Sequence, residues 1–122
     1  VLKPGGLVAA SDWMRIDDNP PSMQMQEYIA AEGLDMYMCS LKRYEQALKN
    51  AGFIEIAIKD RNAWYLGKAH QELAAIEGPL NKQVIDAIGP EETAGAIDIW
   101  KKLIGVLELG EHRPGHFQAV KK

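Results

Sequence analysis

The fold of this chain is decided by its first thirteen residues, Val1-Leu2-Lys3-Pro4-Gly5-Gly6-Leu7-Val8-Ala9-Ala10-Ser11-Asp12-Trp13. Pro4 presets φ and the two glycines permit positive φ, so this stretch predicts a tight turn. The apolar run 7–10 that follows is typical of a strand buried on both faces, and such strands belong to parallel sheets packed between helices. Because ligands bind beyond the carboxyl ends of strands in open α/β sheets, we expect a site around 11–13.

The composition excludes several classes of protein. The chain has 122 residues, is 47% hydrophobic and 25% charged, and carries a net charge of −3. Without a basic block, we expect neither nucleic acid nor a membrane as partner, and no apolar run approaches a membrane span. The single cysteine, Cys39, excludes an internal disulfide and favours a reducing compartment, so we expect a cytoplasmic protein. A buried strand at the start of a chain that lacks an initial methionine indicates a piece of a longer protein.

Helices and strands alternate through the rest of the chain. Ser22 and Ser40 are typical helix caps, and glycines follow both expected helices. The five methionines, all between 14 and 38, predict either core filler or a mobile lid over a small-molecule site. The expected elements are a helix 22–32, a helix 41–51, an alternating strand 54–60, a helix to 77, a short helix 81–88, a helix from 90 to about 109, and a strand 116–120 after a Pro114-Gly115 turn.

Two side chains are the leading candidates for chemistry. Asp12 has two interpretations: a loop residue that caps nearby amides, or a carboxylate that faces an acceptor amine or a bound water. Arg61 is either a surface partner of Asp60 or a bidentate clamp for phosphate or carboxylate. No metal spacing, phosphate loop or Gly-x-Gly-x-x-Gly turn is present, so we expect no metal site and no cofactor-binding turn in this chain.

Aromatic and basic residues nearby have two interpretations as well. Trp13, Trp64 and Tyr65 could wall a cationic methylammonium group, or they anchor their segments to the core. His116 and Arg113 could reach the same pocket, or they belong to a solvated turn.

Several segments together form a recognisable pattern: Leu2-Lys3-Pro4-Gly5-Gly6, Ser11-Asp12-Trp13, Tyr28-Ile29 before Glu32-Gly33, Tyr44 to Phe53, Asp60-Arg61 and Gly115 to Lys122. Taken together, these segments resemble the C-terminal half of a class I S-adenosylmethionine-dependent methyltransferase, similar to the phosphoethanolamine methyltransferases. The resemblance implies an α/β fold: a partial Rossmann-like methyltransferase sheet of the C-terminal strands, with inserted helices and the last strand between the other two. Residues 1–122 then form a single domain that lacks the cofactor-binding N-terminal half.

The same resemblance implies a function. The complete enzyme would transfer a methyl group from S-adenosylmethionine to a small amine or phosphobase, with Asp12 catalytic and with Arg61, Trp13, Trp64, Tyr65 and His116 binding the acceptor. We expect this chain alone to bind the cofactor weakly or not at all and to be inactive. The alternative is a non-catalytic binding or assembly domain derived from a methyltransferase. The expected protein partner is a second copy, joined through the apolar strand 7–10, or the missing N-terminal half.

Overall fold

The computed structural model describes residues 2–122 and divides them into two compact units. The first unit contains the chain up to Pro20, together with Tyr37–Asn62 and Gly110–Lys122. The second unit contains Pro21–Met36 and Ala63–Leu109. Each unit has its own buried side chains, and the expectation that residues 1–122 form a single domain stays a prediction.

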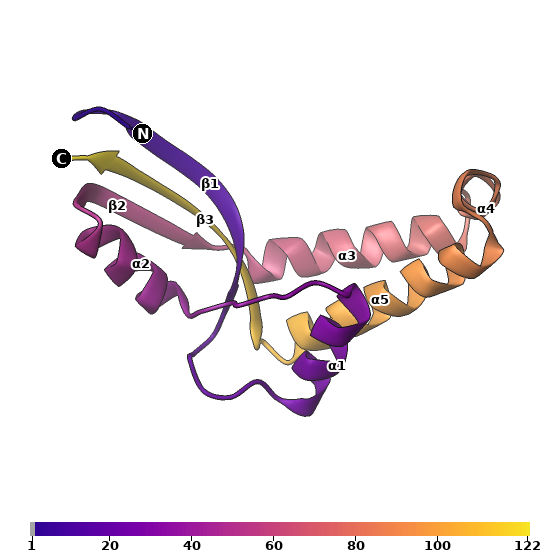
Figure 1. Cartoon of the computed structure of the whole chain (residues 1–122). Helices are drawn as coiled ribbons and strands as arrows, with labels where there is room; N and C mark the ends of the chain where they lie inside the picture. Colours follow the sequence, from indigo (N-terminus) through magenta and orange to yellow (C-terminus); the bar gives the residue numbers. More distant parts are fainter. Residues whose placement is uncertain (1) are drawn as a thin grey trace. The chain divides into compact units, whose positions relative to one another are not determined.

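The first unit is a three-stranded sheet with one helix on it (Figure 1). Its strands are β1 (Leu7–Arg15), β2 (Phe53–Asp60) and β3 (His112–Lys121), in the order β1-β3-β2. Both outer strands run antiparallel to β3, so β1 and β2 point the same way. The prediction that the last strand lies between the other two is confirmed. The helix α2 (Leu41–Asn50) begins at Ser40, whose hydroxyl accepts the Arg43 N–H, as the sequence predicts.

The prediction of a first strand buried on both faces is wrong. β1 is an edge strand, and the side chain of Leu7 is 62% exposed. The strand also continues past residue 10 to Arg15, so Asp12 lies within it rather than beyond its end. An apolar run shows only that the backbone is extended, whereas burial depends on which elements cover the strand.

The predicted turn at Pro114-Gly115 is also wrong, because both residues lie inside β3. The fixed φ of proline is compatible with an extended backbone, and the Pro114 carbonyl accepts the Arg61 N–H at 2.8 Å. Gly115 permits close packing: a Cβ there would lie 3.3 Å from the Lys59 carbonyl oxygen and 3.3 Å from the Met14 sulfur. Pro114 and Gly115 are therefore strand residues, and they lie where β3 packs closely against its neighbours.

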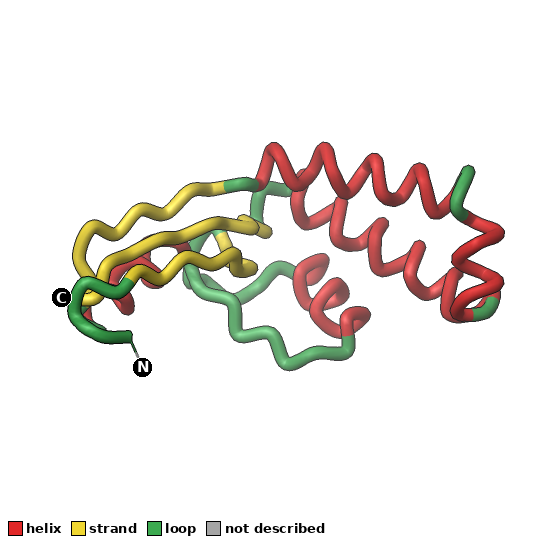
Figure 2. Tube along the Cα trace, turned by 90° about the horizontal axis from the view of Figure 1, so that it is seen from above, coloured by secondary structure: helices red, strands yellow, loops and turns green. Residues whose placement is uncertain are grey.

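The second unit is helical, and Figure 2 shows its two long helices side by side. Its helices are α1 (Met23–Glu32), α3 (Asn62–Glu77), α4 (Asn81–Ile88) and α5 (Pro90–Glu108). The first residue of α3, Asn62, is counted with the first unit. Trp100 of α5 donates to Glu72 of α3 at 3.2 Å, and α1 packs against α5. As predicted, Ser22 caps α1 and Gly33 ends it with φ 67°.

Among the described residues, no helix combines the length and apolar character needed to cross a membrane.

The methionines divide between core and surface. Met14 and Met25 are completely buried, in the first and the second unit respectively, which supports the interpretation as core filler. Met23 is 75% exposed. The interpretation as a lid over a small-molecule site stays a prediction.

Candidate functional site

Asp12 is held by two hydrogen bonds on the face of the sheet that carries α2. Its Oδ2 accepts the Tyr44 hydroxyl at 2.8 Å, and its Oδ1 accepts the Trp13 N–H at 2.8 Å. The Tyr44 ring lies 4.9 Å from that of Phe117 on β3, which fixes the direction of the phenol. Burial, followed by the hydrogen bond to Asp12, raises the pKa of Tyr44 to about 12. The phenol therefore remains a proton donor to the carboxylate at neutral pH.

The sequence did not indicate Tyr44 as a site residue. The helical spacing of Leu41, Tyr44 and Leu48 indicates only that Tyr44 belongs to an apolar stripe of the helix 41–51. The signal was present, however, because Tyr44 is the one side chain in that apolar stripe with a hydrogen-bonding tip. The hydrogen bond from the Trp13 N–H matches the interpretation of Asp12 as a residue that caps nearby amides. Each carboxylate oxygen of Asp12 can accept a further hydrogen bond, so the interpretation that it faces an acceptor amine or a bound water stays open.

Arg61 directly follows β2, and its backbone is anchored to β3 through Pro114. Asp60 and Asp12 both pair with Gly115, so the two acidic residues lie in one row, about 10 Å apart across two strand spacings. Asp60 forms its ion pair with Arg113, Nη1 to Oδ2 at 3.2 Å. Register thus brings Asp12 and the segment around Arg61 to the same end of the sheet.

Trp13 lies one residue from Asp12 and so projects to the opposite face of β1. Its ring centroid is 4.8 Å from that of His112, which is completely buried. Burial lowers the pKa of His112 to about 4, so the imidazole is neutral at physiological pH. Asn62 donates to the carbonyl of His112 at 2.8 Å. In this structure Trp13 therefore packs against a buried side chain, in accord with its anchoring interpretation.

Trp64 and Tyr65 belong to α3 within the second unit. Their rings are 6.3 Å apart, and Trp64 is 50% exposed. Burial, with smaller effects from Glu72 and Glu32, raises the pKa of Tyr65. Because Asp12 belongs to the first unit, acceptor binding by this aromatic pair stays a prediction.

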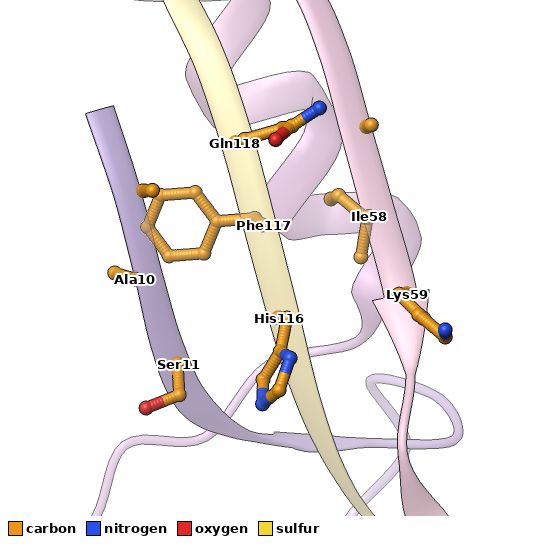
Figure 3. A pocket seen from close by; sticks show the side chains of 9 residues that line it. Ala10, Ser11, Ile58, Lys59, His116, Phe117 and Gln118 are labelled. Carbon is orange, nitrogen blue, oxygen red and sulfur yellow. The ribbon is translucent and has the colours of Figure 1, made fainter. Parts of the chain in front are cut away.

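His116 lies on the face opposite Asp12, in a hollow of about 610 Å³ (Figure 3). The strand register aligns Ser11, His116 and Lys59 in one row across the three strands. The sequence grouped His116 with Asp12, but strand alternation separates them, because residues of neighbouring rows point to opposite faces. Among the described residues, no group of three or more His, Cys, Asp or Glu side chains could hold a metal ion.

Comparison with solved structures identifies the fold as part of an S-adenosylmethionine-dependent methyltransferase fold. A phosphoethanolamine N-methyltransferase 2 from Haemonchus contortus, in complex with phosphomonomethylethanolamine and S-adenosylhomocysteine, matches 98% of this chain with a TM-score of 0.85 and 23% identity. The match covers 27% of that protein. A putative sarcosine dimethylglycine methyltransferase from Galdieria sulphuraria matches the whole chain with a TM-score of 0.84 and 21% identity, over 44% of its own length. The predicted fold class is confirmed.

Curated sequences specify the similarity further. The chain is 32% identical over 120 residues to the phosphoethanolamine N-methyltransferase of Triticum aestivum, and 33% identical over 121 residues to phosphoethanolamine N-methyltransferase 1 of Zea mays. Each match covers 98% of this chain and 23% of the relative, so the chain spans about a quarter of the relatives' length. No family model matches. The predicted resemblance to phosphoethanolamine methyltransferases is confirmed.

Proposed function

We propose that this chain provides the acceptor side of an S-adenosylmethionine-dependent methyltransferase that acts on a small amine or phosphobase. The observation that carries the proposal is the similarity to phosphoethanolamine N-methyltransferases over 98% of the chain. Asp12 lies level with Asp60, the last residue of β2, and Arg61 follows Asp60. This position supports the proposal, because ligands of open α/β sheets bind where strands end.

Each proposed residue has a distinct role. Asp12, directed by Tyr44, accepts a hydrogen bond from the acceptor amine and orients its lone pair for in-line attack. The Arg61 guanidinium binds the phosphate of a phosphobase through two parallel N–H donors. Trp13 supports this end of the sheet through its contact with His112. The work of the chain is to position the acceptor and to exclude water.

The residues present do not fit the cofactor by themselves. β1 is followed by the segment 16–22, which contains no glycine, and β2 is followed by Arg61 alone before α3 begins. A nucleotide-type cofactor needs a glycine-rich turn between a strand and a helix, where backbone N–H groups can approach it closely. We therefore assign no residue of this chain to S-adenosylmethionine, which would supply the methyl group in the complete enzyme.

Titration of the ¹⁵N-labelled chain with phosphoethanolamine, followed by amide chemical shifts, tests the acceptor role. We expect shifts centred on Asp12, Trp13 and Arg61, and about tenfold weaker binding in Asp12→Asn and Arg61→Gln, since each loses a hydrogen bond to a charged group. Asp35→Asn, in an exposed loop, is the matched control and keeps the affinity. Unshifted amides at this end of the sheet, or equal binding by all variants, would remove the proposal.

We further infer that the chain forms a homodimer through β1. Between Leu7 and Ala10 this edge strand carries no charge and no proline, so its free backbone groups can pair with another strand. The opposite edge, β2, is protected by a bulge at which Glu55 has a φ of 50°. The buried Met14 is already packed within its own unit and is not available to a partner.

Light scattering tests the dimer, with an expected mass of twice 13.5 kDa. Leu7→Lys should give a monomer, because it places a charge on the edge. Leu34→Lys is the control, since Leu34 is 64% exposed in a loop and Leu7 is 62% exposed. A wild-type monomer would contradict the inference.

We also propose a cytoplasmic location, which the single free cysteine, Cys39, supports.

A further inference from the structure

We propose that Asp18, in the loop after β1, is a positioning residue for Asp12. It acts through Ser40 and Tyr44, which connect the two carboxylates by a chain of hydrogen bonds. All four residues belong to the first unit. The consequence for the acceptor rests on the proposed function, whereas the effect of Asp18 on the contact between Tyr44 and Asp12 can be measured without any ligand.

Both oxygens of the Asp18 carboxylate accept hydrogen bonds from Ser40. Oδ1 accepts the Ser40 N–H and Oδ2 accepts the Ser40 hydroxyl, each at 2.8 Å. These two hydrogen bonds hold the pKa of Asp18 below its ordinary value, so the carboxylate is anionic at neutral pH. Hydrogen bonds to an ionised acceptor are stronger than those between neutral groups. Asp18 therefore fixes both the backbone and the side chain of Ser40.

Ser40 passes this constraint to the first turn of α2. Its hydroxyl donates its only proton to Asp18, and its oxygen accepts the Arg43 N–H at 3.1 Å. Its carbonyl accepts the Tyr44 N–H at 2.9 Å. Because Tyr44 lies one turn after Ser40, a shift of this turn moves the Tyr44 ring. The 2.8 Å hydrogen bond from the phenol to Asp12 weakens when its distance or angle departs from the optimum.

Arg15 holds the loop in the position from which Asp18 reaches Ser40. Arg15 is 7% exposed, and its Nη2 forms an ion pair with Glu111 at 2.9 Å. Its Nη1 donates to the Asn19 carbonyl at 2.8 Å. The backbone of Arg15 also forms a parallel bridge with Ser40. Because Asn19 directly follows Asp18, the buried Arg15 side chain fixes the loop beside the start of α2.

These contacts form a closed ring that begins and ends on β1. Asp12 and Arg15 lie three residues apart on this strand, and the ring returns from Arg15 through Asp18, Ser40 and Tyr44 to Asp12. A helix cap alone requires only the Ser40 hydroxyl, and the two bonds to Asp18 fix its direction as well. Such support matters for binding, because a site must be held within about 0.5 Å of its productive geometry.

The ligand-free test observes the Tyr44 phenol by NMR, in the chain labelled with ¹³C at Cζ of tyrosine. The chain contains four tyrosines, and Tyr44→Phe assigns the resonance by its loss. Asp18→Ala should move the Tyr44 resonance in the same direction as Asp12→Asn does, because both changes weaken the hydrogen bond. Asp35→Ala makes the same replacement in an exposed loop and should leave the resonance in place. An unmoved resonance in Asp18→Ala would overturn the proposal.

Titration with phosphoethanolamine, followed by amide shifts, measures the consequence for the acceptor. Asp18→Ala should weaken binding about fivefold, the size of a typical coupling between residues in one hydrogen-bond network. The double variant Asp18→Ala/Tyr44→Phe should bind no more weakly than Tyr44→Phe, because Asp18 acts through Tyr44. Additive losses would show that the two residues act independently, and they would overturn the proposal.

Urea unfolding of the same variants separates positioning from a merely structural role. A loss of stability in Asp18→Ala with an unchanged Tyr44 resonance and unchanged affinity would refute positioning. Asp18→Asn keeps the shape and one acceptor oxygen, so it should give intermediate values in both measurements and serves where Asp18→Ala does not fold. If wild type does not bind phosphoethanolamine, the proposed function fails, and the Tyr44 resonance alone decides whether Asp18 positions Asp12.

Discussion

The buried imidazole of His112 makes the stability of the chain depend on pH. Its side chain is completely buried, with the Trp13 ring centroid 4.8 Å away, and burial lowers its pKa from 6.5 to about 4. As pH falls, the unfolded state takes up the proton first, so the folded state loses stability. This contribution is complete above about pH 6.5 and is lost as pH falls towards 4. The difference of about 2.5 pKa units corresponds to about 3 kcal/mol, of which about 2 kcal/mol is lost between pH 8 and pH 5.

Urea unfolding at pH 8 and pH 5, followed by circular dichroism, measures this loss. In wild type the free energy of unfolding should decrease by about 2 kcal/mol at the lower pH. His112→Gln removes the buried titrating group and should remove most of the decrease. His116→Gln removes an exposed imidazole and should retain it. Equal stability of wild type at the two pH values, or an undiminished decrease in His112→Gln, would refute the reasoning.

Three further outcomes follow from the structure. Tyr44→Phe should lower the free energy of unfolding by about 1 kcal/mol, measured in urea, because it deletes the hydrogen bond to Asp12; unchanged stability would contradict this. Ser40→Ala should cost about 2 kcal/mol by the same measurement, because the hydroxyl both caps α2 and donates to Asp18 at 2.8 Å; a loss no larger than that of an ordinary surface substitution would argue against it. Isothermal titration calorimetry with S-adenosylmethionine should detect weak or no binding to this chain, because it lacks a glycine-rich turn; micromolar affinity would be inconsistent with the proposed function.

Helix boundaries were the most predictable feature of the fold. Ser22, Ser40 and Gly33 act where the sequence places them, because a cap depends on residues within one turn of it. The short helix 81–88 was also predicted with its observed bounds. Strand ends were less predictable, since β1 and β3 both extend beyond their apolar or alternating runs. Their outer residues are held in the strands by pairing with each other, for which the local sequence carries no signal.

The site was predictable in part. Asp12 and Arg61 could be selected from the sequence, because Asp12 places a charge just after an apolar run and Arg61 places one just after an alternating run. Tyr44 carried only a weak local signal, its hydrogen-bonding tip within an apolar stripe, and His112 carried none, because the roles of both depend on partners distant in the chain. Tyr44 reaches Asp12 across 32 positions, and His112 meets Trp13 only when β1 pairs with β3.

By itself, the sequence determined the local elements, their caps, the absence of a cofactor-binding turn and the resemblance to a methyltransferase. These properties depend on interactions between residues close in the chain, or on motifs that can be read directly. Only the tertiary structure decided which face of the sheet each side chain occupies, and so separated Asp12 from His116. The physical reason is that a shift of pairing by one residue exchanges the two faces of a strand, and the register is set by packing between segments remote in sequence.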